Sequence, residues 1–516
     1  MNRNASVASG FLTGDLQDLY RHSPRNFSQT QAPPPIDRAR LAGALEKYHR
    51  ALGLWTPGVS KSLERLRHPA SRVVIAGQQA GLLGGPALTV HKAVDAVLLA
   101  RQLSTEDRPV IPVFWVASQD HDTQEIAQTT LMDSEERFFD LSLPFAAEHP
   151  VGRILHQKQW VTRILSALED FQAPQAFKRQ VFDWILESHS GIDRYVDGFV
   201  RLIASQLSAL ELLYVDPLHP ELVTLFDEAL LDELEDPLTG PRHIEEAAQI
   251  LVQRGYKPQL RRPKGSTNLF LEGQDGRRRL LKYEAKTFYA DRSYTQQQLR
   301  QTLVERPGCL TPAAGLRPIL QDKVFPTLAV VLGPGETGYF AQLKDVYPLH
   351  GLEQPVIWPR LTVTWLEPPV VRMLQKYGFT AHAFQSNPNG VFERTLMEQS
   401  GWEDRFDRHQ RNLADLLCEM TEDVNCFDVS LLRPLERARK HSEETLRRLE
   451  RSITQSLMRK DADAQIHFSR LKRHLLPHGV PQERQINFLS FTLKHGTVPL
   501  ERLLQQHPGQ SLEMAL

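Results

Sequence analysis

Two groups of polar residues in this chain have the side-chain types that proton transfer and anion binding require. The first is Asp120-His121-Asp122, in which an imidazole lies between two carboxylates. Neighbouring carboxylates favour the charged form of a histidine, so we expect His121 to hold its proton more readily, which suits proton transfer near neutral pH. Asp122 could instead be the N-cap of a helix. A metal site is the third interpretation, but a second histidine cluster is missing, so we expect no metal.

The second group lies in a glycine-rich stretch from residue 73 to residue 92. The stretch opens with a short apolar run rich in β-branched residues, which predicts a buried strand. After Ala87 the apolar residues recur every three or four positions, which predicts a helix with Pro86 in its first turn. Four glycines between the two elements permit a tight turn and the close approach of a ligand to the backbone. They are Gly77, Gly81, Gly84 and Gly85.

A strand, a glycine-rich turn and a helix in this order are typical of an anion-binding site, because free N–H groups and the helix dipole point at the turn. Gln78 and Gln79 lie within the turn, and His91 and Lys92 lie on the first turns of the helix. Polar and titratable groups are therefore placed where a ligand would bind. The glycine spacing matches neither a dinucleotide-binding loop nor a Walker loop, so an ordinary strand-to-helix turn remains the alternative.

A second glycine-rich turn, which contains Gly333, Gly335 and Glu336, follows a predicted strand over 328–332. Because Glu336 is a carboxylate at a place that favours anions, we expect it either to bind an amine or a ribose hydroxyl, or to offset the dipole of the next helix. Arg360 follows one more predicted strand and could hold a carboxylate or a phosphate.

The alternation of strands and helices predicts an α/β fold in which insertions interrupt one core sheet. The insertions include a β-hairpin near residues 268–283 with Asp-Gly at its turn. In an open α/β sheet, ligands bind beyond the carboxyl ends of the strands. We therefore expect the two glycine-rich turns and the Asp120-His121-Asp122 triplet to surround one pocket.

The two ends of the chain differ from this core. Residues 1–36 are predicted to form a polar N-terminal arm. Beyond residue 385, long charged helices with narrow apolar stripes predict an antiparallel hairpin or coiled coil, which often forms an oligomer contact. Glutamates are interleaved with the arginines of 433–451, which favours a solvated, ion-paired face over a nucleic-acid patch.

Composition narrows the class of protein. The 516 residues carry a net charge of −1 and are 41% hydrophobic, a soluble balance that draws the chain neither to nucleic acid nor to a membrane. Three cysteines and no CxxC fit a reducing cytoplasm and exclude a disulfide framework. No signal peptide is visible, and no apolar run approaches the roughly 20 residues that span a bilayer.

Several motifs together resemble the fingerprint of the bacillithiol-synthesis cysteine ligases, the BshC family. They follow one another in order over nearly the whole chain, from about residue 10 to about residue 505. The motifs are Gly77-Gln78-Gln79-Ala80-Gly81-Leu82 with Gly85-Pro86, Thr89 and Lys92; Pro112-Val113-Phe114-Trp115 followed by Asp120-His121-Asp122; Arg317-Pro318 with Gln321-Asp322; Gly333-Pro334-Gly335-Glu336 with Tyr339; and Gln482-Glu483-Arg484 with Asn487.

The resemblance implies a Rossmann-like core related to class I synthetases, with connecting-peptide insertions and a C-terminal α-helical coiled coil that forms a homodimer. The implied segments are a first part of the core over 1–150, a helical insertion over 151–208, a core return over 209–240, an α/β insertion with a hairpin over 241–315, the last part of the core over 316–388, and a coiled-coil dimerisation region with a C-terminal cap over 389–516.

The implied reaction joins L-cysteine to the amine of glucosaminyl-malate in the last step of bacillithiol biosynthesis, with ATP as the cofactor. Lys92 and His91 would contact phosphates, and His121, flanked by Asp120 and Asp122, would take a proton from the glucosamine ammonium. Glu336 or Arg360 would hold the ammonium or the malate carboxylates. The remaining implied ligand-binding residues are Gly77, Gln78, Gln79, Gly81, Gly84, Gly85, Pro86, Thr89, Gly333, Gly335 and Tyr339.

Two other functions stay open. The chain could be a nucleotide-binding dimeric scaffold that recruits another ligase, or a tRNA-linked relative of the synthetases. The second would bind RNA in a strongly salt-dependent manner, and the near-zero net charge argues against it.

Overall fold

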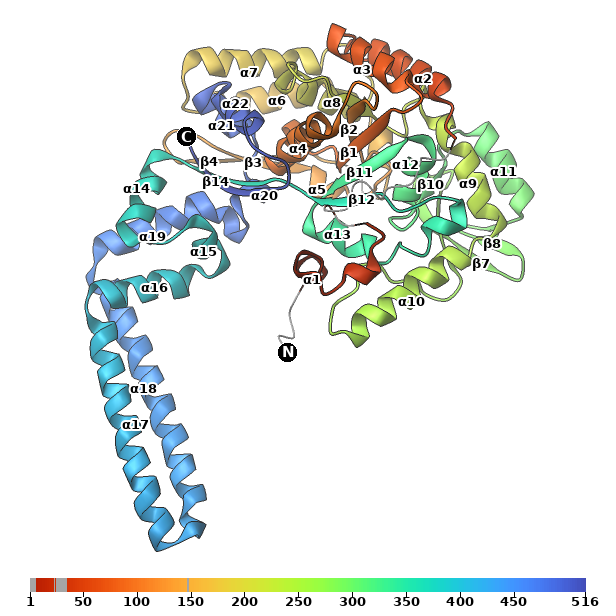
Figure 1. Cartoon of the computed structure of the whole chain (residues 1–516). Helices are drawn as coiled ribbons and strands as arrows, with labels where there is room; N and C mark the ends of the chain where they lie inside the picture. The colour runs from red at the N-terminus through yellow and green to blue at the C-terminus, as the bar shows by residue number, and fades with distance from the viewer. Residues whose placement is uncertain (1–5, 23, 25–34, 146–147) are drawn as a thin grey trace. The chain divides into compact units, whose positions relative to one another are not determined.

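A computed structural model of the chain describes residues 6–22, 24, 35–145 and 148–516, and it divides into two compact units (Figure 1). The first unit consists of residues up to 363 together with 486–512, and the second of 364–485 together with 513–516. The second unit thus begins earlier in the chain than the expected boundary at 388/389. Because the chain leaves the first unit and returns to it, residues far apart in the sequence complete that unit.

A five-stranded sheet forms the centre of the first unit, and its strand order is β12-β11-β1-β2-β5. All four strand pairs are parallel. The strands are β1 (Arg72–Gln78), β2 (Val110–Val116), β5 (Leu213–Val215), β11 (Thr327–Leu332) and β12 (Val356–Pro359). β1, β11 and β12 coincide with strands predicted above, because a parallel strand is covered on both faces and therefore reads as a continuous apolar run. Val73 to Ala76 are all buried.

The helix α4 (Leu88–Leu103) packs against β1, β2 and β11. Every residue from Leu88 to Ala100 is buried, including the polar ones, so this helix lies within the core rather than on the surface. The other helices of the first unit are α1 (Val7–Thr13), α2 (Arg38–Ala51), α3 (Pro57–Arg67), α5 (Thr123–Ile126), α6 (Lys158–Ala167), α7 (Gln175–Ser188), α8 (Tyr195–Gln206), α9 (Asp227–Glu235), α10 (Thr239–Gln253), α11 (Gln296–Glu305), α12 (Arg317–Val324), α13 (Pro334–Phe340), α21 (Leu489–His495) and α22 (Val498–Leu504).

The direction of the strand order reverses between β1 and β11. The chain proceeds from β1 to β2 and β5 on one side of β1, and then places β11 and β12 on the other side. This is the order of a Rossmann-like fold, in which ligands bind at the reversal, beyond the carboxyl ends of the strands. We call this place, between the ends of β1 and β11, the crevice. Both predicted glycine-rich turns follow these two strands, so the fold brings them to the same crevice.

Two insertions interrupt the core. After β2 come the antiparallel pair β3 (Gln128–Met132) and β4 (Phe138–Ser142) and the helices α6 to α8. A second, antiparallel sheet in the order β10-β6-β7-β8-β9 follows α10, and its hairpin turns at the predicted Asp275-Gly276. Its strands are β6 (Ser266–Glu272), β7 (Arg278–Glu284), β8 (Thr287–Tyr289), β9 (Ser293–Tyr294) and β10 (Leu310–Pro312).

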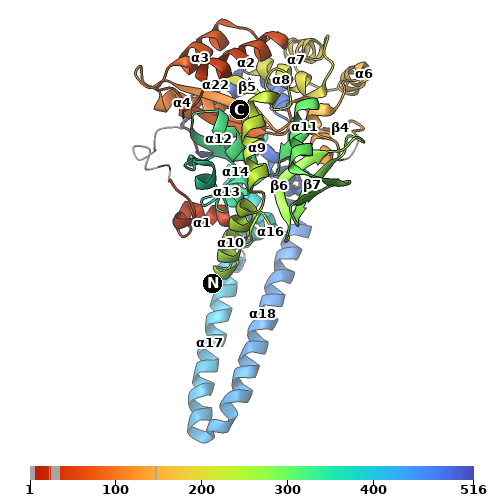
Figure 2. The same ribbon diagram turned by 90° about the vertical axis from the view of Figure 1, so that its right-hand side faces the viewer.

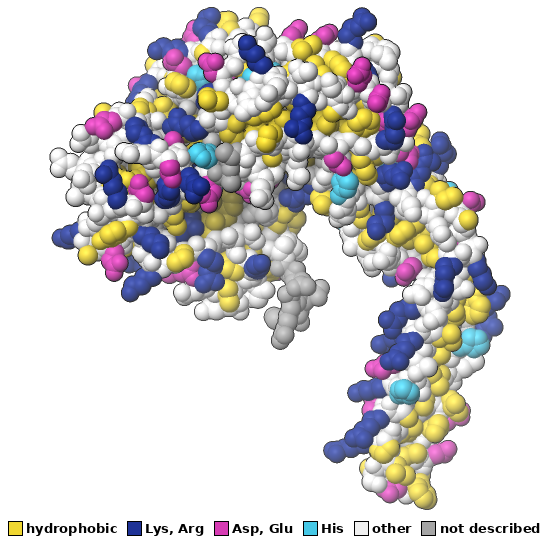
Figure 3. Space-filling view, turned by 180° about the vertical axis from the view of Figure 1, so that it is seen from behind, with side chains coloured by type: hydrophobic (Ala, Val, Ile, Leu, Met, Phe, Trp, Pro, Cys, Tyr) yellow, Lys and Arg dark blue, Asp and Glu magenta, His cyan; other side chains and the backbone are white. Residues whose placement is uncertain are grey.

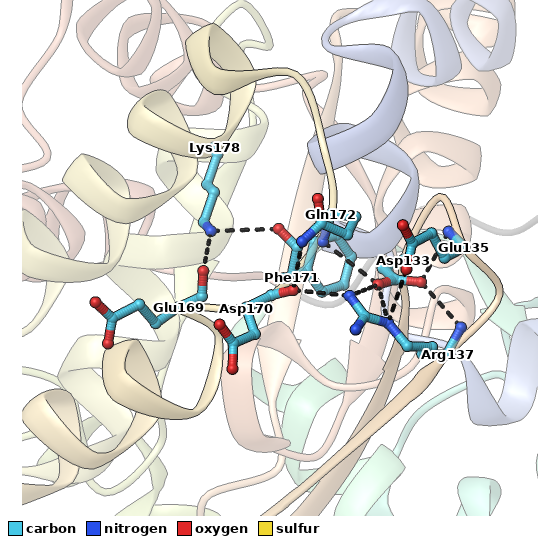
Figure 4. Close-up of polar contacts among 8 residues, drawn as sticks. All are labelled: Asp133, Glu135, Arg137, Glu169, Asp170, Phe171, Gln172 and Lys178. Atoms are coloured by element: carbon cyan, nitrogen blue, oxygen red, sulfur yellow. Dashed lines mark hydrogen bonds and ion pairs between the residues drawn. The ribbon is translucent and has the colours of Figure 1, made fainter.

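A buried carboxylate connects the β3–β4 turn to the loop between α6 and α7 (Figure 4). Asp133 is 1% exposed and accepts hydrogen bonds from its own turn and from the helical loop. The donors are the N–H groups of Glu135 and Arg137 at 2.9 Å, Arg137 Nε at 2.9 Å and the Gln172 N–H at 3.4 Å. Lys178 of α7 also donates to the carbonyls of Glu169 and Phe171 in this loop.

We expect Asp133→Ala to lower the free energy of unfolding by about 2 to 3 kcal/mol, because it removes the buried acceptor of four part-buried hydrogen bonds. Chemical denaturation measures this. Asp170→Ala is the matched control: Asp170 lies in the same cluster, but its side chain is exposed and only its carbonyl accepts from Arg137. The control should change stability by no more than about 0.5 kcal/mol. Equal losses in the two variants would contradict this account.

The N-terminal segment is not wholly the polar arm that the sequence predicts. Val7 to Thr13 form α1, which packs against α13, and Tyr20 is buried with its hydroxyl donating to the Thr337 carbonyl at 2.8 Å. The apolar residues of this segment are too few for a clear periodic signal in the sequence. Residues 1–5, 23 and 25–34 of the predicted arm lie outside the described residues.

The second unit is helical. Its short helices form an aromatic core around Tyr377, Phe384 and Phe392. The helices are α14 (Pro368–Tyr377), α15 (Ala381–Ser386), α16 (Pro388–Gln399), α17 (Trp402–Phe427), α18 (Leu432–Lys460), α19 (Ala462–Leu475) and α20 (Gln482–Gln485). The strands β13 (Thr362–Leu366) and β14 (Ser511–Ala515) pair with each other.

The two long helices α17 and α18 lie side by side and run in opposite directions, which confirms the predicted antiparallel hairpin (Figure 2). Few of their side chains are buried, and Figure 3 shows apolar side chains along the hairpin with lysines and arginines beside them. Exposed members include Leu416, Met420, Phe427, Val429 and Leu449. Within the described residues, every helix is too short or too polar to traverse a lipid bilayer.

Candidate functional site

Lys92 of α4 connects the two glycine-rich turns at the crevice between β1 and β11. Its Nζ donates to the Gly77 carbonyl at 2.9 Å, to Gln78 Oε1 at 3.1 Å and to Glu336 Oε2 at 2.5 Å. Gly77 and Gln78 end β1, whereas Glu336 lies in the turn after β11. The three N–H donors of the ammonium therefore all have protein acceptors, and they hold the carboxyl ends of β1 and β11 together.

Glu336 also accepts a hydrogen bond from the Gly333 N–H at 2.8 Å, as the capping residue of α13. The N-terminus of this helix, which would otherwise attract an external anion, already holds a carboxylate of the chain itself. The structure thus supports the helix-capping interpretation of Glu336. Its side chain remains 28% exposed, so the carboxylate can still meet a bound cation.

Burial lowers the pKa of Lys92, and the positive charges of Arg360 and Arg317 lower it further, whereas Glu336 raises it. The side chain of Lys92 is only 4% exposed. A lysine in this environment depends on its carboxylate partner for its charge. Any ligand that draws Glu336 away would therefore also change the protonation of Lys92.

Arg360, Arg317 and Tyr339 surround this ion pair. Arg360 is 6% exposed, donates to the Leu361 carbonyl at 3.0 Å, and lies beside Gly333. Arg317 donates to Tyr339 Oη at 3.2 Å. The sequence analysis names Arg360 and Tyr339 as site residues and Arg317 only within a motif, although Arg317 contacts Tyr339 and acts together with Arg360 on the pKa of Lys92.

The conformation of the first turn explains its glycines. Leu83, Gly84 and Gly85 all have positive φ angles, of 55°, 90° and 74°. A Cβ atom on Gly81 would lie 2.7 Å from the Cα atom of Gly85. The backbone at these two residues therefore approaches itself at a distance that only glycine allows. These glycines are needed for the fold of the turn itself.

The N-terminus of α4 is covered by the segment that returns to the first unit near residue 486. The Ala87 N–H donates to the Ile486 carbonyl at 2.8 Å, and Asn487 Nδ2 donates to the Leu83 carbonyl at 3.0 Å. Other amides of the turn are also bonded within the chain; they are those of Gly81, Gly84, Gly85 and Thr89. The turn therefore offers an external anion fewer backbone donors than the sequence predicts.

His91 and Thr89, at the start of α4, are also enclosed within the chain. His91 is fully buried, and its ring packs edge-on against Phe488 with 6.3 Å between the ring centroids. Thr89 is also fully buried, next to Gly85, and its hydroxyl has no hydrogen-bond partner among the described residues. Pro86 forms a β-bridge with Asn487. These residues therefore pack around the turn and support its conformation.

Asp120 connects the end of β2 to the end of β1. Gln79 Nε2 donates to Asp120 Oδ2 at 2.6 Å, and the other carboxylate oxygen accepts the His121 N–H at 2.7 Å. Gln78 contacts Lys92, and the next residue, Gln79, contacts Asp120. Two consecutive glutamines thus connect the first glycine-rich turn to Lys92 and to the Asp120-His121-Asp122 triplet. Asp122 caps α5 by accepting the Glu125 N–H at 3.4 Å, which confirms the capping interpretation of that residue.

The prediction that His121 holds its proton more readily is wrong. Burial lowers the pKa of His121, and the positive charge of Arg278 lowers it further, which outweighs the neighbouring carboxylates. Arg278 Nη1 lies 3.1 Å from His121 Nδ1, whereas the nearest carboxylate oxygen of Asp120 is 3.7 Å from that nitrogen. The side chain of His121 is 37% exposed, so the ring remains accessible.

Arg278 is the main site residue that the sequence analysis missed. It is the first residue of β7, in the hairpin of the second insertion, and its guanidinium lies 4.0 Å from the centroid of the Phe270 ring. The predicted Asp-Gly turn locates this hairpin in the sequence. Nothing in the spacing of its residues shows that the hairpin reaches the end of β2. Within the described residues, no cluster of three or more histidine, cysteine or acidic side chains could hold a metal ion.

Two family models match the chain and together cover nearly all of it. The N-terminal Rossmann-like domain of bacillithiol biosynthesis BshC matches residues 3–361, and the C-terminal coiled-coil domain of BshC matches residues 363–516. The chain belongs to the BshC family. Its predicted fold class, a Rossmann-like α/β core with a C-terminal coiled coil, is confirmed by these matches and by the sheet topology.

Relatives named "Putative cysteine ligase BshC" align along most of their length. A protein from one strain of Thermus thermophilus is 38% identical over 87% of this chain and 88% of its own. Its counterpart from a second strain of the same species is 38% identical over 90% and 92%. A protein of Salinibacter ruber is 30% identical over 96% and 91%. The two family domains meet at residue 362, close to the division between the compact units, but residues 486–512 of the coiled-coil match belong to the first unit.

Proposed function

We propose that this BshC-family protein is a cysteine ligase that forms an amide between the carboxyl group of L-cysteine and the amine of glucosaminyl-malate, the last step of bacillithiol biosynthesis. One observation carries the proposal: at the point where the strand order reverses, Lys92 contacts Gln78 and Glu336, and the adjacent Gln79 contacts Asp120 at the end of β2. This is where Rossmann-like proteins bind small ligands. The names of the relatives support the same reaction class.

The residues of the crevice suit the two substrates. Glu336 can accept hydrogen bonds from an ammonium group, and Arg360 can pair with a carboxylate of the malate. Lys92 can compensate the negative charge that develops on the acyl oxygen during attack. The attacking amine must lose a proton, and Asp120 and His121, which lie next to each other at the end of β2, are the groups placed to receive or steer that proton.

A carboxylate resists attack by an amine, so we propose ATP as the source of activation. The two glycine-rich turns do not fit a phosphate cradle as they stand. Glu336 occupies the N-terminus of α13, and the Ile486 carbonyl accepts a hydrogen bond at the N-terminus of α4. We therefore assign no step to the nucleotide, and the reaction is to be measured with and without it.

The test is formation of bacillithiol from glucosaminyl-malate, L-cysteine and ATP, followed by mass spectrometry. We expect His121→Ala to lower kcat/KM at least tenfold, or about 1.4 kcal/mol of barrier. The exposed His409 of α17 is the control, and His409→Ala should keep the rate. If the folded wild-type protein makes no product under any of these conditions, the proposal fails. Product that appears only after a second protein is added would favour the scaffold function.

We further propose that the protein is a homodimer held by the α17–α18 hairpin and that it works in the cytoplasm. Exposed apolar side chains along the hairpin, such as Met420 and Leu449, support the dimer. A groove of about 910 Å³ between the helices is lined by Leu413, Leu417 and Leu446. All three cysteines are free thiols, as a reducing compartment requires. A monomeric mass in light scattering at micromolar concentration would contradict the dimer.

A further inference from the structure

The side chain of Arg278 is held rigidly in the first unit. Its Nε donates to Thr311 Oγ1 at 2.8 Å, and Nη2 donates to the Pro312 carbonyl at 2.5 Å. Its guanidinium stacks on the ring of Phe270, and burial lowers its pKa to about 10, so it remains charged at neutral pH. Thr311 and Pro312 belong to β10, and Phe270 belongs to β6, the other strand of the hairpin, which pairs with β10. Nη1 is thereby directed at one partner, His121 Nδ1, at 3.1 Å.

The chemistry of arginine fixes the roles in this contact. A guanidinium has only donors, so Nη1 donates and Nδ1 must accept with its lone pair. A neutral imidazole that accepts at Nδ1 carries its proton on Nε2. A second proton on Nδ1 would break this hydrogen bond and place two positive groups in contact. Arg278 therefore disfavours both the other tautomer and the charged ring.

We propose that Arg278 is a positioning residue that keeps His121 neutral with its proton on Nε2, so that the ring acts as a hydrogen-bond donor toward the acyl oxygen of the cysteine substrate. These roles of Arg278 and His121 rest on the proposed ligase function. It leaves the carboxylate of Asp120, which can only accept, as the group that receives the proton of the attacking amine. Arg278 itself does not touch the reacting atoms.

The other charged groups that face His121 act in the opposite direction. Asp120 and Asp122 on its own loop, and Glu148 on the segment that precedes the helical insertion, all favour the charged ring. Among the described charged groups that act most strongly on the ring, Arg278 is the one that opposes protonation. Burial of the ring would still lower the pKa of His121 after Arg278 is removed, but the charge that opposes the three carboxylates would be lost, so we expect the substitution to raise that pKa.

The experiment is histidine ring NMR on the full-length protein labelled with ¹³C and ¹⁵N histidine. The His121 signals are those missing from His121→Gln. We expect a neutral wild-type ring with its proton on Nε2 at pH 7, and a titration midpoint below the ordinary value of about 6.5. Arg278→Gln should raise that midpoint by about one pH unit and allow both tautomers. The acid limb of the pH profile of kcat/KM should move in the same direction.

Arg279→Gln is the matched control, because Arg279 is the next residue on β7 but pairs with Asp275 instead of His121. It should leave the His121 midpoint unchanged. Arg278→Lys keeps the charge without the planar fork, so it should restore part of the low midpoint. A wild-type ring protonated on Nδ1, or an unchanged midpoint in Arg278→Gln, would overturn the proposal. The wild-type tautomer decides the question even if Arg278→Gln does not fold.

The two proposals can fail separately. If the NMR results are as expected but no bacillithiol forms, Arg278 controls the state of His121 and the ligase function is wrong. If bacillithiol forms while His121 is indifferent to Arg278, the ligase function stands and the positioning role is wrong. The measurements on the ring need neither substrate nor nucleotide, which keeps these outcomes distinct.

Discussion

Replacing Lys92 with methionine is expected to lower kcat/KM for bacillithiol formation by at least about a hundredfold, equivalent to about 2.7 kcal/mol of barrier. Methionine keeps the length of the side chain but removes all three hydrogen bonds to Gly77, Gln78 and Glu336. The crevice would lose its positive charge where negative charge develops during amide formation. The Glu336 carboxylate would also lose the partner that holds it between β1 and β11.

The matched control is Lys61→Met, because Lys61 forms an exposed ion pair with Glu211 away from the crevice. Exposed pairs of this kind contribute little, so that variant should keep both its activity and its stability. Circular dichroism separates a folded, inactive Lys92→Met protein from an unfolded one. If the Lys92→Met protein is folded and still turns over at the wild-type rate, Lys92 has no role in the reaction.

Gly81→Ala should destabilise the protein by about 3 kcal/mol or more. The added Cβ would lie 2.7 Å from Gly85 Cα and 3.3 Å from Gly85 N, which are backbone atoms that a rotamer change cannot move. The neighbouring residues offer no relief, because Leu83 and Gly84 already have positive φ angles and Asn487 holds the Leu83 carbonyl. The free energy of unfolding, measured by chemical denaturation, reports the loss.

Gly335→Ala provides the comparison. A Cβ atom on Gly335 would meet no atom of the described residues within 4 Å, and this glycine lies in the first turn of α13, where alanine is well tolerated. Stability should therefore change by no more than about 0.5 kcal/mol. If Gly335→Ala keeps its stability but loses activity, the space above this residue is needed by a ligand. If Gly81→Ala is as stable as the wild type, the turn is looser than its backbone distances indicate.

Much of the fold can be predicted because the core strands are covered on both faces. Apolar runs such as Val73–Ala76 leave few alternatives to a buried strand, and the glycines that follow mark the carboxyl ends where ligands bind. The helical hairpin is also visible in the sequence, since α17 and α18 keep a regular apolar stripe. These are local patterns, and each is complete within one segment of the chain.

The rest of the site depends on contacts between distant segments. Arg278 reaches His121 across more than a hundred residues, and burial together with its charge reverses the expected direction of the pKa of His121. Asn487 completes a turn that lies some four hundred residues earlier. The segment that contains α1 has too few apolar residues to show a period. Neither composition nor spacing shows such pairings, because they are set by the way the insertions fold back onto the core.

The return of the chain at Ile486 has a consequence for biosynthesis of the protein. Among the described residues, Ile486 accepts from the amide of Ala87, and Asn487 donates to the carbonyl of Leu83. A ribosome makes these partners long after it has made the strands of the parallel sheet. A nascent chain that is stalled within the helical hairpin should therefore carry an unfinished crevice, open to proteases and to chaperones, until residues 486 and 487 have left the ribosome.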